Sequence, residues 1–174
     1  VFLNYTLKTA RYTFDCPLVT GAILAGAQER DIKKLSELGI LIGQAFQIQD
    51  DIIGIFDSQK NIGKSILSDL AESKKTILVI HAHSRLRGNE RKAFLKCFNK
   101  EKKTYADLRT IRKIFIQSGS LDYSLKQIKS RIATTLKLLS ELKMKKSYRY
   151  VIESAIHQLF KHSFRIAEEN NIPV

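Results

Sequence analysis

Apolar residues recur at every third or fourth position along most of the chain, and this spacing is typical of amphipathic helices. No segment alternates apolar and polar residues between hairpin turns, as a β-strand would. Only two prolines, Pro17 and Pro173, interrupt the sequence, so long helices can form. The pattern therefore predicts an all-α protein.

The expected helices begin and end where this periodicity does. The first covers residues 1–27, either unbroken or kinked at Pro17, and Asp31 is the expected N-cap of a second helix that ends near Phe56. The polar residues 57–69 predict a loop. Further helices are expected over residues 73–86, 90–99, 104–117, 121–142 and 148–168, before a loose tail.

The composition is that of an ordinary globular chain. At 174 residues and 44% hydrophobic content, residues 1–174 can form a single domain with one core. Two cysteines are too few for a disulfide framework, and no apolar run reaches membrane-spanning length. With no secretory signal either, we expect a cytoplasmic protein without a transmembrane segment.

The net charge is strongly positive, at +13 from 30 basic and 17 acidic residues. Such a balance suits nucleic acid, but the basic residues are spread along the chain, without an evident alternation of basic and aromatic residues. Phosphate-bearing small molecules or an acidic partner protein would fit equally well. Charge alone therefore leaves the partner open.

Two adjacent aspartates, Asp50 and Asp51, stand in the apolar segment FQIQDDIIG. Burying neighbouring carboxylates is costly unless a positive group offsets the charge. On a helix, Gly43, Gln47, Asp50 and Gly54 form one narrow stripe with Asp51 at its edge. We expect this stripe to face an internal cavity, where its glycines leave room for a ligand. A cation held by oxygen ligands, best Mg²⁺, would explain the pair, as would an ordinary cap and a lysine ion pair.

Basic residues and hydroxyls lie near the aspartates in sequence order. Downstream come Lys64, Asp69 and the run Lys74–Lys75–Thr76, and Lys8–Thr9 interrupts an apolar helix upstream. Each lysine taken singly could be a solvated surface charge. Together with a metal-binding acidic pair, they form the composition expected for a diphosphate site.

The order of these motifs resembles that of the trans-type polyprenyl diphosphate synthases. Their second aspartate-rich motif, G-x-x-F-Q-x-x-D-D-x-x-D, is matched by residues 43–51 up to its last position. The family's later G-K, D and K-x-T are matched by Gly63–Lys64, Asp69 and residues 74–76. An upstream K-T-A is present at Lys8–Ala10. The resemblance spans the chain and is strongest to archaeal geranylgeranyl and other short-chain synthases.

This resemblance implies an isoprenoid synthase fold, a helical bundle around a central cavity. It implies a prenyltransferase of isoprenoid biosynthesis that uses Mg²⁺ to ionise an allylic diphosphate and joins the resulting cation to isopentenyl diphosphate. It also implies a homodimer and no nucleic-acid partner.

The resemblance further implies a role for individual residues. Asp50, Asp51 and Asp69 would hold metal. Lys8, Lys64 and Lys74 would bind the substrate diphosphate. Thr9 and Gln47, with Lys8, would act where the cation forms. Phe46 would line the cavity near the prenyl chain, although a plain core role suits it equally.

Two features depart from the family pattern. Gly54 stands at the third aspartate of the motif, and the family's first D-D-x-x-D motif has no counterpart in the chain. Because Val1 already lies within an amphipathic pattern, we expect the C-terminal portion of a synthase, without its N-terminal helices and inactive alone. A non-catalytic partner subunit and a basic helical nucleic-acid-binding protein remain alternatives.

Overall fold

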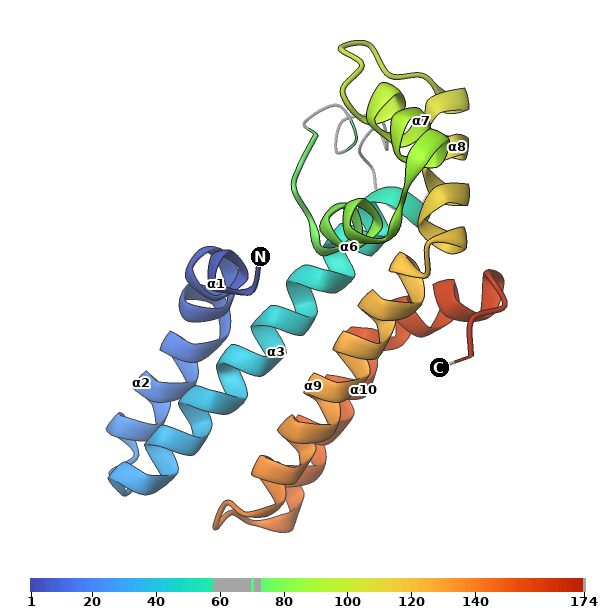
Figure 1. Ribbon diagram of the computed structural model, residues 1–174. Coiled ribbons are helices and arrows are strands. Elements are labelled where there is room, and N and C mark those ends of the chain that lie inside the picture. The colour runs from blue at the N-terminus through green and yellow to red at the C-terminus, as the bar shows by residue number, and fades with distance from the viewer. Residues whose placement is uncertain (58–69, 71–72, 174) are drawn as a thin grey trace. The chain divides into compact units, whose positions relative to one another are not determined.

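The computed structural model describes residues 1–57, 70 and 73–173, and within them it contains helices and no β-strand (Figure 1). The prediction of an all-α protein is confirmed. The helices are α1 (Phe2–Tyr5), η1 (Thr6–Asp15), α2 (Cys16–Leu24), α3 (Glu29–Phe56), α6 (Ile77–Arg85), α7 (Gly88–Phe98), α8 (Tyr105–Gln117), α9 (Ser120–Ser140) and α10 (Lys146–Glu169).

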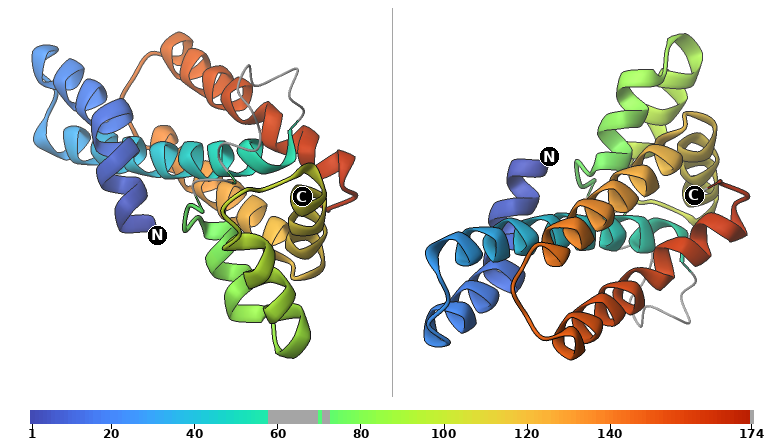
Figure 2. Two further views of the ribbon diagram at one scale, coloured as in Figure 1. Left: turned by 90° about the horizontal axis from the view of Figure 1, so that it is seen from above. Right: turned by 90° about the horizontal axis from the view of Figure 1, so that it is seen from below.

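The chain divides into two compact units. Unit 1 comprises Val1–Gln47 and Gln127–Lys161, and unit 2 comprises Ile48–Lys126 and His162–Val174. The long helices α3, α9 and α10 each contribute residues to both units. In unit 1, the parts of α9 and α10 on either side of their short connection run antiparallel (Figure 2).

The first expected helix, residues 1–27, is helical from Phe2 to Leu24, but its middle part is a wider helix than an α-helix. Thr6–Asp15 forms a π-helix, and Pro17 falls in the first turn of α2. A proline has no amide hydrogen to donate and is tolerated in a first helical turn. The expected kink at Pro17 is therefore replaced by a change from π-helix to α-helix beside it.

The turn from α2 to α3 depends on one glycine. Gly26 has a φ of +69°, a left-handed conformation that costs glycine little. Its amide donates to the Ile23 carbonyl, and the next amide, of Ala27, donates to the Ala22 carbonyl, both at 3.0 Å. These two bonds are those of a Schellman C-cap, which ends α2 sharply.

The beginning of α3 differs from the expectation. The helix starts at Glu29, so Asp31 lies in its first turn and is not the N-cap. Two acidic residues, Glu29 and Asp31, occupy that turn, where the positive end of the helix dipole stabilises carboxylates. The prediction that α3 ends near Phe56 is confirmed.

Two helix starts in unit 2 are set by threonine caps. The Thr76 side chain accepts a hydrogen bond from the Val79 amide, so α6 begins at Ile77 and not at residue 73 as expected. Thr104 and Asp107 form a reciprocal capping box that starts α8. Lys74 and Lys75 consequently lie in the segment before α6.

Candidate functional site

The paired aspartates lie near the C-terminal end of α3. Asp50, Asp51, Lys74 and Thr76 line one small cavity of unit 2, with a volume of about 30 Å³, and the side chains that share it are Ile55, Leu70, Val79, Phe98 and Phe115. The structure thus brings an acidic pair and a lysine from a separate segment to a single opening. That volume accommodates a water molecule or an ion, and a larger group would have to bind at its mouth.

The two aspartates of the pair differ in burial. Asp50 is exposed and Asp51 is half-buried, whereas Ile48 and Ile52 on the same helix are fully buried. The pair therefore lies at the rim of a cavity, whereas the stripe was expected to face an internal one. The sequence shows the apolar neighbours of a helical residue but not the direction in which its own side chain points.

The segment that presents Lys74 is anchored by the preceding serine. Ser73 has a φ of +47°, an uncommon conformation for a residue with a side chain. Its hydroxyl donates to the Phe98 carbonyl at 3.0 Å and accepts from Lys103 Nζ at 2.9 Å. These bonds hold the turn that leads into Lys74, and no motif in the sequence indicated this role for Ser73 or Lys103.

A cluster of charged side chains fixes the end of α3. Arg112 of α8 donates to the Ile55 carbonyl at 2.5 Å and to the Asp57 carbonyl at 2.9 Å, which satisfies carbonyls that the helix leaves unbonded. The Asp57 carboxylate is buried, forms an ion pair with Arg165 at 3.3 Å and contacts the His162 imidazole. Burial lowers the pKa of the Arg112 guanidinium, and the nearby Asp57 charge partly offsets this effect. The helix that carries the paired aspartates therefore has a well-anchored C-terminal end.

In unit 1, the K-T motif and α3 meet directly. Thr9 Oγ1 donates to Gln47 Oε1 at 2.5 Å, which joins two residues that the resemblance placed together. Lys8 precedes Thr9 on η1 and is exposed. Phe46 is half-buried and packs against Phe14, with ring centroids 5.4 Å apart. This contact is consistent with a core role for Phe46.

A polar network next to the Thr9–Gln47 pair was not predicted from the sequence. Gln44 donates to the Thr6 hydroxyl at 2.8 Å and accepts from Arg131 Nε at 2.9 Å. The Arg131 guanidinium also donates to Gln127 and lies over the Phe2 ring, 4.3 Å from its centroid. The network ties η1, α3 and α9 together within unit 1. The polar Gln44 on an otherwise apolar helix was the one sign of this network in the sequence. Its partner Arg131 is 87 positions away, so the sequence did not indicate the pairing.

Gly43 has a different role from the one expected. A Cβ atom at Gly43 would clash with Cα of Ala10, and one at Gly39 would lie 2.7 Å from Cα of Asp15. The two glycines, one helical turn apart, therefore let η1 approach α3 closely. The space at Gly43 is filled by protein backbone, so the expectation that it leaves room for a ligand is wrong.

Two of the expected site residues, Lys64 and Asp69, lie outside the described residues. Among the residues that the structure describes, no three histidine, cysteine, aspartate or glutamate side chains come together to hold a metal. The same described part of the chain has no helix long and apolar enough to cross a bilayer.

Comparison with known proteins identifies a family and several relatives whose sequences are similar to this chain. Residues 4–115 match the family model described as polyprenyl synthetase. A geranylgeranyl diphosphate synthase of Sulfolobus acidocaldarius is 30% identical over 162 residues, which are 90% of this chain and 49% of the relative. A short chain isoprenyl diphosphate synthase of Methanocaldococcus jannaschii is 32% identical over 71% of this chain and 37% of the relative. The chain thus spans half or less of the length of these curated relatives.

Solved structures show the same fold. The crystal structure of a geranylgeranyl pyrophosphate synthase from Corynebacterium glutamicum, in complex with isoprenyl diphosphate and magnesium, superposes with a TM-score of 0.83. Its sequence is 25% identical, and the match covers 91% of this chain and 45% of that one. The expected isoprenoid synthase fold is therefore confirmed.

Proposed function

Because the chain belongs to the polyprenyl synthetase family, we propose that it carries the allylic diphosphate-binding part of a prenyltransferase that condenses an allylic diphosphate with isopentenyl diphosphate. The strongest support for this proposal is the cavity that Asp50, Asp51 and Lys74 share. These residues come from two segments of the chain, and the family's motifs follow one another in the same order. The similarity to geranylgeranyl and other short-chain isoprenyl diphosphate synthases favours a short-chain synthase of the geranylgeranyl class.

The donor groups at this cavity suit magnesium. Carboxylate oxygens are hard ligands, and Mg²⁺ commonly binds through one or two carboxylates while substrate phosphates and water complete its shell. Asp50 and Asp51 supply two such carboxylates, and Asp69 is a proposed third on the resemblance alone. Bound there, magnesium would neutralise charge on the departing diphosphate.

The remaining residues would bind and position the substrate. Lys74, with Lys8 and Lys64 by resemblance, would hold the diphosphate as it leaves, because ammonium groups stabilise developing negative charge. Thr9 and Gln47, fixed by their mutual hydrogen bond, would place amide and hydroxyl dipoles near the allylic carbon where positive charge develops. Phe46 would exclude water beside them.

Several finer features belong to this proposal. We expect the chain alone not to turn over substrate, because the family's first aspartate-rich motif has no counterpart in it. A homodimer, a cytoplasmic location and the absence of a nucleic-acid partner stay predictions. In the alternative of a partner subunit, the chain would complete a site with another polypeptide.

The proposal can be tested by isothermal titration calorimetry, in which inorganic pyrophosphate is added to the 174-residue chain with and without Mg²⁺. We expect binding that requires Mg²⁺ and that falls about 100-fold or more in the double variant Asp50→Asn/Asp51→Asn, because both metal ligands are lost. The double variant Glu90→Gln/Glu101→Gln changes the charge equally at exposed positions of unit 2 and should bind as the parent does.

Binding that ignores Mg²⁺, or that survives the loss of both aspartates, would contradict the proposal. Turnover of an allylic diphosphate by this chain alone would show that the expectation of inactivity is wrong. Binding that decreases steeply with salt and is equal for pyrophosphate and single-stranded RNA would favour the nucleic-acid alternative.

A further inference from the structure

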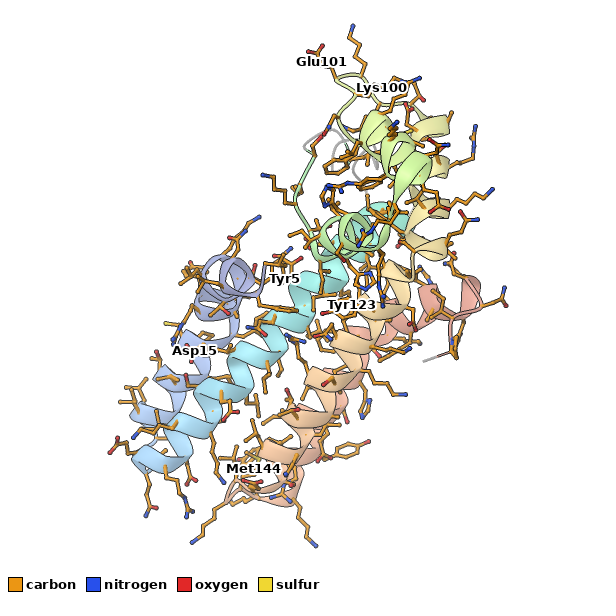
Figure 3. The ribbon with its side chains drawn as sticks, in the orientation of Figure 1. Tyr5, Asp15, Lys100, Glu101, Tyr123 and Met144 are labelled. Carbon is orange, nitrogen blue, oxygen red and sulfur yellow. The ribbon has the colours of Figure 1, made fainter. Side chains whose placement is uncertain are left out.

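The connection between α9 and α10 concentrates positive charge. Residues 142–152 contain Lys143, Lys145, Lys146 and Arg149 and no acidic residue. Met144, labelled in Figure 3, marks this connection at one end of unit 1. The even spread of basic residues expected from the sequence does not hold here, where they are interleaved with two tyrosines.

Large apolar side chains are exposed beside these lysines. In the first turns of α10, Tyr148 is 62%, Tyr150 70% and Val151 61% exposed. Leu24, the last residue of α2, is 83% exposed, and the turn between α2 and α3 lies at the same end of unit 1 as the α9–α10 connection (Figures 1 and 2). An ion pair of 2.7 Å between Lys34 and Glu141 connects the start of α3 to the α9–α10 connection. Clustered apolar exposure of this kind commonly marks an interaction surface.

Two acidic groups near this end, Glu141 and Glu29, are paired with other cations. Glu141 accepts from Lys34, and this hydrogen bond lowers the pKa of the Glu141 carboxyl, so it stays ionised and paired. Glu29 pairs with Lys33 at 2.6 Å. The positive charge of residues 143–146 is therefore left to act on a partner outside the unit.

We propose that this surface, formed by Lys143, Lys145, Lys146, Tyr148, Tyr150 and Val151, binds the headgroup region of an anionic lipid bilayer. Lysines near an anionic membrane surface are each attracted by roughly 1 kcal/mol, which is about fivefold in binding. Tyrosine suits the same depth, because its ring is apolar and its hydroxyl remains in contact with water.

The aliphatic side chains favour lipid over nucleic acid. Single-stranded nucleic acid is bound by aromatic rings that stack on bases and by cations that contact phosphates. Exposed aliphatic side chains such as Val151 and Leu24 contribute to neither kind of contact. A bilayer buries such side chains at the boundary with its acyl chains. The inference goes beyond the proposed function, and the apolar chain of a prenyl diphosphate product would be released beside a bilayer that can take it up.

Co-sedimentation of the 174-residue chain with phosphatidylcholine vesicles, with and without phosphatidylglycerol, tests the charge. We expect binding to the anionic vesicles only, and a loss of about tenfold or more in Lys143→Gln/Lys145→Gln/Lys146→Gln. The matched variant Lys92→Gln/Lys96→Gln/Lys113→Gln removes the same charge from exposed positions of α7 and α8 and should keep its binding.

The absence of tryptophan from the chain permits a second measurement that needs no loss of charge. Tyr148→Trp should show a blue-shifted emission with anionic vesicles and quenching by brominated lipid, because its ring enters the apolar boundary. Tyr105→Trp, at an exposed position that begins α8, should show neither change.

Several results would overturn the inference. These are equal binding to neutral vesicles, an equal loss in the matched lysine variant, an unshifted emission of the Tyr148→Trp variant, and binding to single-stranded RNA in place of vesicles. Dimerisation through this surface, seen by light scattering and abolished by the triple lysine variant, would likewise assign the surface to a second copy of the chain. None of these outcomes depends on Asp50 or Asp51, so the proposed function is tested separately.

Discussion

Each of the two units buries one aspartate in an ion pair, whereas the first aspartate of the motif is accessible. In unit 1, the buried Asp15, labelled in Figure 3, is paired with Arg11 at 2.7 Å. In unit 2, Asp57 is only 5% exposed, is paired with Arg165 and contacts His162. Asp50 of the motif is exposed. The two buried carboxylates are thus neutralised by cations of the protein, whereas Asp50 of the motif is accessible to solvent.

The units differ in what joins their helices. Unit 1 brings η1 against α3 through Gly39 and Gly43, where a single added carbon has no space. Unit 2 fixes the end of α3 with charged groups, of which Asp57 and Arg112 lie at the centre. Close backbone contact should tolerate almost no change in volume, whereas a charge cluster should tolerate a change in shape but not the loss of a charge.

The largest expected effect is therefore in unit 1. Gly43→Ala places a methyl group against the backbone of Ala10, which cannot rotate away, and should lower the free energy of unfolding by about 3 kcal/mol, the upper part of the range for overpacking. Urea denaturation measures the loss. Gly21→Ala, in α2 with no atom near the added carbon, should be neutral or stabilising by up to about 1 kcal/mol. Equal effects of the two changes would refute the close-packing explanation.

The next effect concerns the charge cluster of unit 2. Asp57→Asn keeps the side-chain volume but leaves Arg165 and His162 without their carboxylate, and should cost about 2 kcal/mol, less than a fully buried pair because Arg165 is partly exposed. Denaturation midpoints measure the cost. Asp122→Asn breaks only a more exposed pair with Lys126 and should cost less than about 0.5 kcal/mol. If Asp57→Asn costs no more than this control, the cluster does not stabilise α3.

A smaller effect isolates helix capping within unit 2. Thr104→Ala should cost about 1 kcal/mol, because the Asp107 amide loses its acceptor. Hydrogen bonds from Lys100 and Thr104 hold the pKa of the Asp107 carboxyl at about 2. Stability from the ionised carboxyl is present above its unfolded pKa and is lost as the pH falls towards 2. Titration by NMR should show a higher pKa of Asp107 in the variant, and an unchanged value would contradict the capping box.

The smallest effect is a pH dependence at His81, which stacks on Tyr123 and contacts the Ser120 hydroxyl. Burial lowers the pKa of its imidazole, and the nearby Arg85 adds to this effect. The folded state therefore favours neutral His81, whose stabilisation is complete above the unfolded pKa of 6.5 and decreases as the pH falls below it. The stability difference between the parent and His81→Gln should therefore narrow from about pH 7.5 to about pH 5, as urea denaturation at the two pH values would measure. A constant difference would exclude this titration.

Part of the candidate site was predictable because it depends on order along the chain. The resemblance of the ordered motifs to a known family placed Lys74 with Asp50 and Asp51 and Thr9 with Gln47, and the structure brings each set together. The hydrogen bonds that hold the neighbourhood of these residues in place were not predictable from the sequence. Ser73 and Arg131 act through partners many positions away, and nothing in their immediate sequence distinguishes them from ordinary surface residues.

The sequence by itself determined that the protein is helical, where Thr104 starts α8, and to which family it belongs. These features arise from periodicity, local hydrogen bonds and the linear order of motifs. Only the tertiary structure decided that Asp57 is buried while Asp50 is exposed, and that Gly43 receives the backbone of Ala10. Burial and close approach depend on which distant segment packs against a residue, and that choice minimises the free energy of the whole chain, not of its local stretches.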